Sequence, residues 1–195
     1  VGGFLGSIAI ATGFALAVTY PRAGNIGGGG FMLVYLADRK KTVAIDYRET
    51  APAAITRDSF LDALGNADPQ KSIASGLGVG VPGTVAGLAL AHRKYGSGKF
   101  TLAQLIAPSI ALARDGFIVD GDLADTFASA RPLFERWPSS RKVFLKADGQ
   151  SYGQGERLVQ TDLANTLEAI AKTGPRAFYQ GSIADKIAAS VRSAG

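Results

Sequence analysis

The chain contains no cysteine and only one histidine, His92. The first absence excludes disulfide bonds, thiolate metal sites and a cysteine nucleophile. A single histidine cannot form a histidine-rich metal site, and it makes a catalytic serine–histidine pair a weak candidate. His92 precedes two basic residues at a predicted helix end, where a cation interacts favourably with the helix dipole. We therefore assign His92 a structural role and expect no metal site.

Concentrated positive charge is also missing. The net charge is +5 over 195 residues, and the basic residues are scattered without interleaved aromatics. Nucleic-acid binding usually requires a basic face. We therefore expect no nucleic-acid partner, and we interpret the basic clusters as solvated turns and helix ends.

The first 21 residues, Val1–Pro21, carry no charge at all. A secretory signal would open with a basic region, which is absent here, and glycines and hydroxyl residues dilute the hydrophobicity that a membrane span needs. The pattern instead predicts a buried helix over Ile8–Thr19 that ends at Pro21. The chain starts without methionine and stops abruptly, so we interpret it as a piece of a longer protein.

The remaining pattern predicts one β-hairpin surrounded by many helices, an α+β chain. Alternating apolar residues indicate paired strands over Phe31–Leu36 and Thr42–Tyr47. From Thr56 onward the chain looks helical, and Val81–Thr84 reads as a turn in which Gly83 can take a positive φ. Capping residues and stop signals mark the later helices: Thr84–Tyr95, Thr101–Leu112, Asp122–Phe134, Asp162–Ala171 and a last one capped by Ser182.

The most informative segment is the run of four glycines, Gly27–Gly30, before the first strand. Such a run costs backbone entropy, so something must lie against bare main chain or φ must be positive. Alternation in the second strand places Arg48 on the face opposite Val43 and Ile45. Its guanidinium can bind a carboxylate bidentately, or it can pair with a neighbouring acid, and the residues alone favour neither. Together the two segments indicate a site for a small anionic substrate.

Other catalytic motifs fail. The glycine run lies between a helix and a strand, the reverse of a dinucleotide fingerprint. Gly96–Lys99 is followed by Phe100 where a phosphate loop needs Ser or Thr. No Gly-x-Ser-x-Gly elbow occurs, and the acidic pairs Asp46/Glu49 and Asp120/Asp122 read as strand-end and capping residues. The chain therefore supplies no convincing nucleophile.

Several segments, in order, resemble the large subunit of the γ-glutamyltranspeptidases, also called γ-glutamyltransferases or glutathione hydrolases. They are Ala15–Thr19, Ala23–Met32, Asp46–Pro52, Val81–Gly87 and Leu112–Phe117. The resemblance implies an N-terminal-nucleophile hydrolase with an αββα sandwich. Residues 1–195 would form a single piece of the large subunit, not an independent domain. Arg48 matches the family arginine that binds the α-carboxylate of the γ-glutamyl group.

The same resemblance implies a precursor that cleaves itself into two subunits, with the catalytic threonine at the start of the small one. No catalytic residue is then expected in this chain, and no cofactor. The implied activity is cleavage of γ-glutamyl compounds such as glutathione or glutamine, with transfer to water or amino acids, in the periplasm or outside the cell. A glutaryl-cephalosporin acylase on the same scaffold and a non-catalytic module for acidic ligands are the alternatives. The sequence departs from the family at Phe4–Ser7, where a polar Asn and Asp pattern is usual.

Overall fold

The structure, a computed structural model, describes residues 2–195, with side chains from residue 6 onward. The departure at Phe4 and Leu5 therefore lies outside the described side chains. The helices and strands are α1 (Gly2–Thr19), β1 (Phe31–Leu36), β2 (Lys41–Asp46), α2 (Pro69–Ile73), the 3₁₀ turn η1 (Gly76–Gly78), α3 (Thr84–Tyr95), α4 (Leu102–Asp115), β3 (Phe117–Ile118), α5 (Gly121–Arg136), α6 (Pro138–Phe144), β4 (Arg157–Leu158), α7 (Thr161–Thr173), α8 (Arg176–Tyr179) and α9 (Ser182–Ser193).

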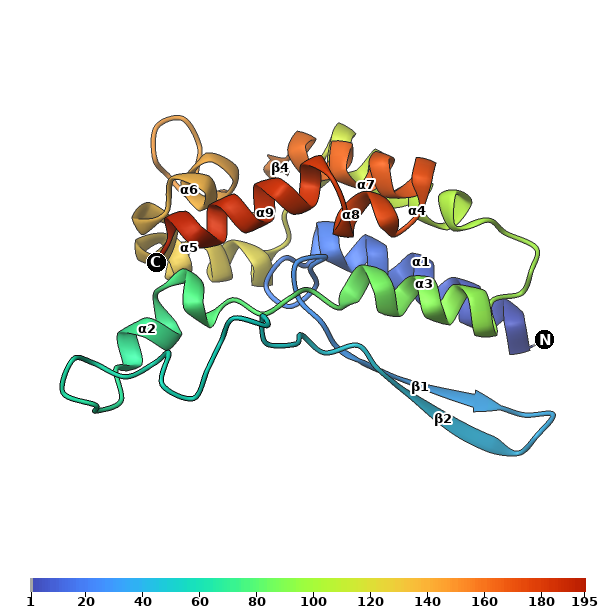
Figure 1. Ribbon diagram of the computed structural model, residues 1–195. Coiled ribbons are helices and arrows are strands. Elements are labelled where there is room, and N and C mark those ends of the chain that lie inside the picture. Colours follow the sequence, from blue (N-terminus) through green and yellow to red (C-terminus); the bar gives the residue numbers. More distant parts are fainter. Residues whose placement is uncertain (1) are drawn as a thin grey trace.

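The main core explains why α1 carries no charge. Helix α1 packs against α3 and α4, and α7 covers α4; Figure 1 shows α1 beside α3. Ile10, Phe14 and Val18 of α1 are at most 1% exposed. The predicted buried helix is confirmed, although it begins earlier, at Gly2. Among residues 2–195, no helix combines the length and hydropathy that crossing a membrane requires.

A second, smaller core lies under α5 and α6. Val119, Leu123, Phe127 and Leu158 are buried there. Aromatic rings surround Phe127, and the Phe134 and Phe144 rings stack with their centroids 5.0 Å apart. Phe117 packs against both this core and the main one, so apolar contact joins the two.

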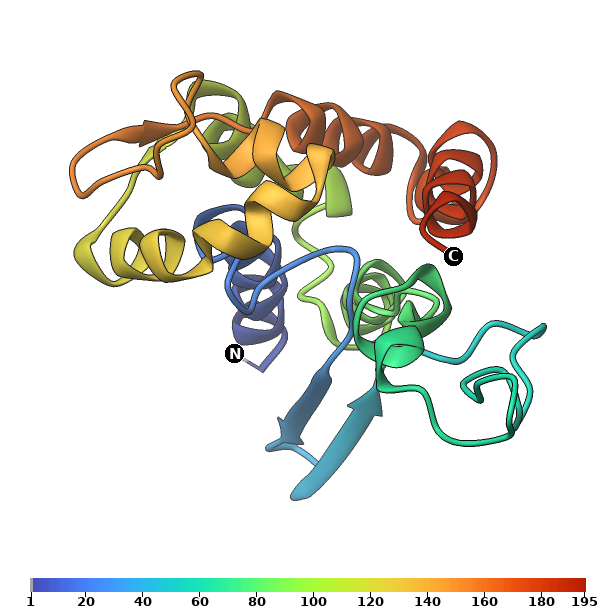
Figure 2. The same ribbon diagram turned by 90° about the vertical axis from the view of Figure 1, so that its left-hand side faces the viewer.

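The β1–β2 hairpin projects away from the helices, and both views agree on this (Figures 1 and 2). The strands are antiparallel, with Phe31 opposite Asp46 and Leu36 opposite Lys41. Met32 and Val34 pack on the main core, whereas Phe31, Leu33 and Tyr35 on the other face are 64%, 74% and 62% exposed. The predicted hairpin is confirmed, and with it the mixed α and β fold class. Both sheets in the described chain are two-stranded.

The helix signals were mostly reliable. Thr101 and Gln104 form the predicted capping box, with the Thr101 N–H donating to Gln104 Oε1 at 2.8 Å. Gly116 ends α4 with a φ of 80°. The last helix starts at Ser182, as predicted. The predicted cap by Ser182 is wrong, because Gly181 occupies the N-cap with a φ of 71° and no side chain caps the helix.

The helical interpretation from Thr56 onward is wrong for residues 56–68, which form turns. Asp62 accounts for part of this loop, because its carboxylate accepts the backbone N–H groups of Leu64 and Asn66, each at 2.8 Å. These bonds, led by that from Asn66, lower the pKa of Asp62 below its ordinary value. A side chain that satisfies the backbone in this way competes with helix formation.

Candidate functional site

Arg48 lies just beyond the end of β2, on the solvent side of the hairpin root. Ile45 is buried and Arg48 is exposed, as the alternation predicted. The Arg48 backbone N–H donates to Asp46 Oδ1 at 3.0 Å. In the described chain the guanidinium makes no ion pair or hydrogen bond, so the alternative pairing with Asp46 or Glu49 is not formed. The side chain is therefore free to receive an anion.

The glycine run lies directly against the main chain around Arg48. Gly30 and Tyr47 exchange both backbone hydrogen bonds, at 3.3 and 3.0 Å. A Cβ at Gly29 would come within 2.8 Å of Arg48 Cα and Glu49 N. Gly27–Gly30 do not appear among the glycines with positive φ in residues 2–195. Of the two predicted reasons for the run, close approach is therefore the one that applies.

The start of α3 closes the other side of this segment. The N–H groups of Gly83 and Thr84 donate to the Gly28 carbonyl at 2.7 and 3.0 Å. A Cβ at Gly83 would lie 1.9 Å from the Tyr47 carbonyl oxygen. The expectation of a positive φ at Gly83 is wrong, since φ is −106°. Glycine is needed at position 83 because the main chain of Tyr47 and Arg48 passes directly against it.

Tyr179 of α8 supports the start of α3. The sequence analysis did not predict this role. Its hydroxyl donates to the Pro82 carbonyl at 2.8 Å and accepts the Ala86 N–H at 3.1 Å. Burial raises the pKa of this phenol above its ordinary value. Its partners lie over 90 positions away in the chain, and no local pattern encodes such a contact.

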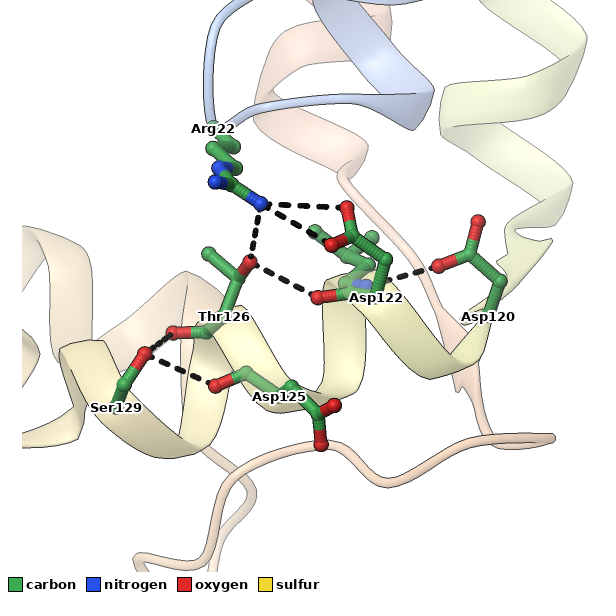
Figure 3. Close-up of polar contacts among 7 residues, drawn as sticks. Arg22, Asp120, Asp122, Asp125, Thr126 and Ser129 are labelled. Carbon is green, nitrogen blue, oxygen red and sulfur yellow. Dashed lines mark hydrogen bonds and ion pairs between the residues drawn. The ribbon is translucent and has the colours of Figure 1, made fainter.

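Arg22 anchors the entrance of the glycine run to α5, as Figure 3 shows. Its Nη1 lies 3.2 Å from Asp122 Oδ1 and 3.3 Å from Thr126 Oγ1. Asp120 caps α5 by accepting the Leu123 N–H at 2.8 Å. Asp120 is therefore a capping residue, as the sequence indicated, whereas Asp122 is an ion-pair partner of Arg22, which the sequence did not indicate.

The remaining sequence candidates have structural roles. His92 Nε2 lies 2.8 Å from the Phe100 carbonyl oxygen near the end of α3. Within residues 2–195, no cluster of acidic or histidine side chains could hold a metal ion. A largely apolar pocket of about 610 Å³ lies between η1 and α9. Arg48 does not line this pocket, whereas Pro82 and Tyr179, which support the start of α3, do.

Comparison with known proteins identifies the architecture. The crystal structure of Helicobacter pylori γ-glutamyltranspeptidase superposes with a TM-score of 0.91 at 44% identity, covering 96% of this chain and 53% of that one. A cephalosporin acylase from Bacillus halodurans superposes with a TM-score of 0.78 at 27% identity, over 96% of this chain and 35% of that one. The fold is therefore that of the N-terminal-nucleophile hydrolases, as predicted.

The sequence comparisons define the family. Residues 7–195 match the family model described as gamma-glutamyltranspeptidase, and the chain belongs to this family. It is 47% identical over 195 residues to the glutathione hydrolase proenzyme of Escherichia coli K12. That match takes in 100% of this chain and 33% of the relative, so the chain spans about a third of the length of the curated relatives it matches.

Proposed function

We propose that this chain is the substrate-binding part of an enzyme that cleaves γ-glutamyl amides and transfers the γ-glutamyl group to water, amino acids or peptides. Arg48 binds the α-carboxylate of that group. The observation that carries the proposal is an exposed guanidinium without an acidic partner in the described chain, on a strand end enclosed by main chain. An arginine at a fixed strand end can make a bidentate contact to a carboxylate through its guanidinium fork.

The chemistry itself belongs to a second polypeptide. A threonine at the start of the small subunit attacks the γ-amide, with its own α-amino group as base, and an oxyanion hole there holds the tetrahedral intermediate. This chain contributes positioning through Arg48 and no catalytic residue. No cofactor or metal enters the reaction. Glutathione and glutamine are the expected substrates.

The small subunit comes from the same precursor, an assignment supported by the name proenzyme carried by the Escherichia coli relative. Residues 1–195 then act as one piece of the large subunit and do not form an independent domain. We assign the complete enzyme to the periplasm or the extracellular space, where the family commonly acts.

The first rival is a glutaryl-cephalosporin acylase. The identity of 27% to the acylase is well below the 47% to the glutathione hydrolase, which favours γ-glutamyl substrates. A second rival is a module that binds acidic ligands without turnover. One assay distinguishes both rivals from the proposed enzyme, because neither an acylase nor a non-catalytic module turns over a γ-glutamyl anilide well.

The test is turnover of a γ-glutamyl anilide by the complete two-subunit protein, comparing wild type with Arg48→Ala. Removing a desolvated bidentate carboxylate contact should cost about 2–5 kcal/mol in kcat/KM. Arg93→Ala, which removes another exposed arginine, is the matched control and should leave kcat/KM unchanged. Normal turnover by Arg48→Ala would overturn the role of Arg48. No turnover by wild type would overturn the γ-glutamyl assignment, and turnover of a glutaryl amide would then identify an acylase.

A further inference from the structure

The ring of Tyr47, the residue before Arg48, lies between two glycines from different elements. A Cβ at Gly87 of α3 would lie 2.2 Å from Tyr47 Cγ and 2.4 Å from its Cβ. A Cβ at Gly30 would lie 3.0 Å from Tyr47 Cε2 on the same ring. Real Cβ atoms essentially never lie as close to carbon as a Cβ at position 87 would, so the ring requires glycine there. A Cβ at position 30 would press tightly on the ring edge, and the ring would have to shift slightly. We call this arrangement of Gly30, Tyr47 and Gly87 the ring slot.

The ring is held in this slot by van der Waals packing, because the Tyr47 hydroxyl has no hydrogen-bond partner in the described chain. The side chain is half-buried and packs on the main core. Burial raises the pKa of the phenol, so the ring is neutral over the physiological range. Nothing in the slot requires the hydroxyl, and a phenylalanine would fill it equally well.

The slot lies against the main chain that leads into Arg48. Both backbone groups of Tyr47 are bonded to Gly30, and its carbonyl oxygen rests against Gly83. Arg48 itself has one such restraint, the bond from its N–H to Asp46. The packing of Gly87 reaches the Cβ of Tyr47, where its side chain joins the main chain. Since Tyr47 and Arg48 share a peptide bond, a displacement of the Tyr47 main chain would move the Arg48 Cα as well. A misplacement of about 1 Å is enough to spoil a bidentate contact.

We propose that Tyr47 is a positioning residue, whose ring, held between Gly30 and Gly87, orients Arg48 toward the substrate carboxylate. This inference rests on the proposed function of Arg48. It predicts that damage to the ring slot weakens substrate binding without slowing the chemical step, because Arg48 contacts a group that does not react. It also predicts that damage to the ring slot has little effect on KM when the side chain at position 48 binds the carboxylate without a fixed orientation.

The experiment measures kcat and KM for a γ-glutamyl anilide on the complete two-subunit protein. Tyr47→Ala should raise KM about tenfold while kcat stays within about twofold, the signature of lost uniform binding. Tyr47→Phe should restore wild-type values, because the ring is kept. Tyr152→Ala removes a half-buried tyrosine from the small core, and it should lower the melting temperature without raising KM.

The decisive comparison repeats Tyr47→Ala in an Arg48→Lys background. A lysine is a flexible point charge that depends less on orientation than a guanidinium fork. If Tyr47 acts through Arg48, the second change should add less than about twofold to KM there. An equal rise in both backgrounds, or a loss confined to kcat, would overturn the proposal. If wild type does not turn over the anilide at all, the proposed function falls with it.

Two further variants guard against a folding defect. Gly87→Ala pushes the ring out of the slot from the α3 side and should reproduce the KM rise, whereas Gly121→Ala meets no atom closer than 3.6 Å and should leave KM unchanged. If Tyr47→Ala yields no two-subunit protein, Tyr47→Leu replaces it, since leucine keeps apolar volume but not the ring. Its KM should rise at least about threefold; an unchanged KM would overturn the proposal.

Discussion

Main-chain atoms meet at the root of the hairpin more closely than any Cβ would permit. Gly29 faces Arg48 and Glu49, and Gly83 faces the Tyr47 carbonyl. The sequence predicted that the glycine run answers a close approach or a positive φ, and it predicted Arg48 from strand alternation. It could not choose between the two reasons for the glycines, because the approaching segment lies 17 positions or more away.

Alanine at Gly29 tests this contact. Its methyl group would meet backbone atoms that cannot rotate away, so we expect a cost of about 1–3 kcal/mol. Gly27→Ala is the matched control, because a Cβ there meets only Asn25 Oδ1 at 4.0 Å and φ is not positive. Thermal melting of the two-subunit protein should show a lower Tm for Gly29→Ala alone. Equal melting temperatures would contradict the close-approach explanation.

Elements with local start and stop signals were predictable, and elements that depend on distant partners were not. The α4 capping box and its closing Gly116 formed as the sequence indicated. The loop at residues 56–68 did not, since Asp62 satisfies backbone groups that a helix would have used. The support of α3 by Tyr179 likewise depends on how α8 packs, which helix periodicity alone does not specify.

The loop between α6 and β4 supplies a pH prediction. Glu156 accepts Lys146 Nζ at 2.9 Å and the Gly153 N–H at 2.6 Å, and its pKa is lowered, chiefly by the bond from Lys146. A carboxyl whose pKa is lower in the folded protein stabilises the fold above its unfolded value of 4.5, and loses this effect as pH falls through the folded pKa.

Amide exchange of Gly153 is the measurement, expressed as a protection factor on either side of pH 4.5. Protection should be high above that value and should fall well below it. In Glu156→Gln, which cannot titrate, protection should be lower at neutral pH and should not change across the range. The same acid-dependent loss in the glutamine variant would show that another group is responsible.

At the scale of the whole molecule, one face of the hairpin has no cover within the described chain. Phe31, Leu33 and Tyr35 are each more than 60% exposed, on strands that project from the helices (Figure 2). Such an apolar face marks an interface or an aggregation hazard. The family resemblance predicted that this chain forms one piece of a larger αββα sandwich. The pattern of residues alone predicted only a hairpin with many helices.

We expect residues 1–195, produced alone, to aggregate, because the exposed face and the free strand edges can pair with other copies. Light scattering during refolding measures this. Leu33→Lys, placed on the exposed face, should reduce the scattering, whereas Leu64→Lys in the loop after β2 is an equally apolar control, 86% exposed, and should not. A monomer that stays in solution and melts cooperatively would contradict the expectation that this piece is not an independent domain.

The main-chain packing around Arg48 also bears on redesign. Since glycines set the path of the backbone on both sides, the position of residue 48 in space is largely decoupled from the identity of its side chain. A mutant library aimed at other acyl groups should therefore vary position 48 and its outward neighbours, and leave Gly29, Gly30, Gly83 and Gly87 unchanged. Substitutions at those glycines would disturb the path of the main chain, whereas substitutions at position 48 would change the recognition of the acyl group on an unaltered backbone.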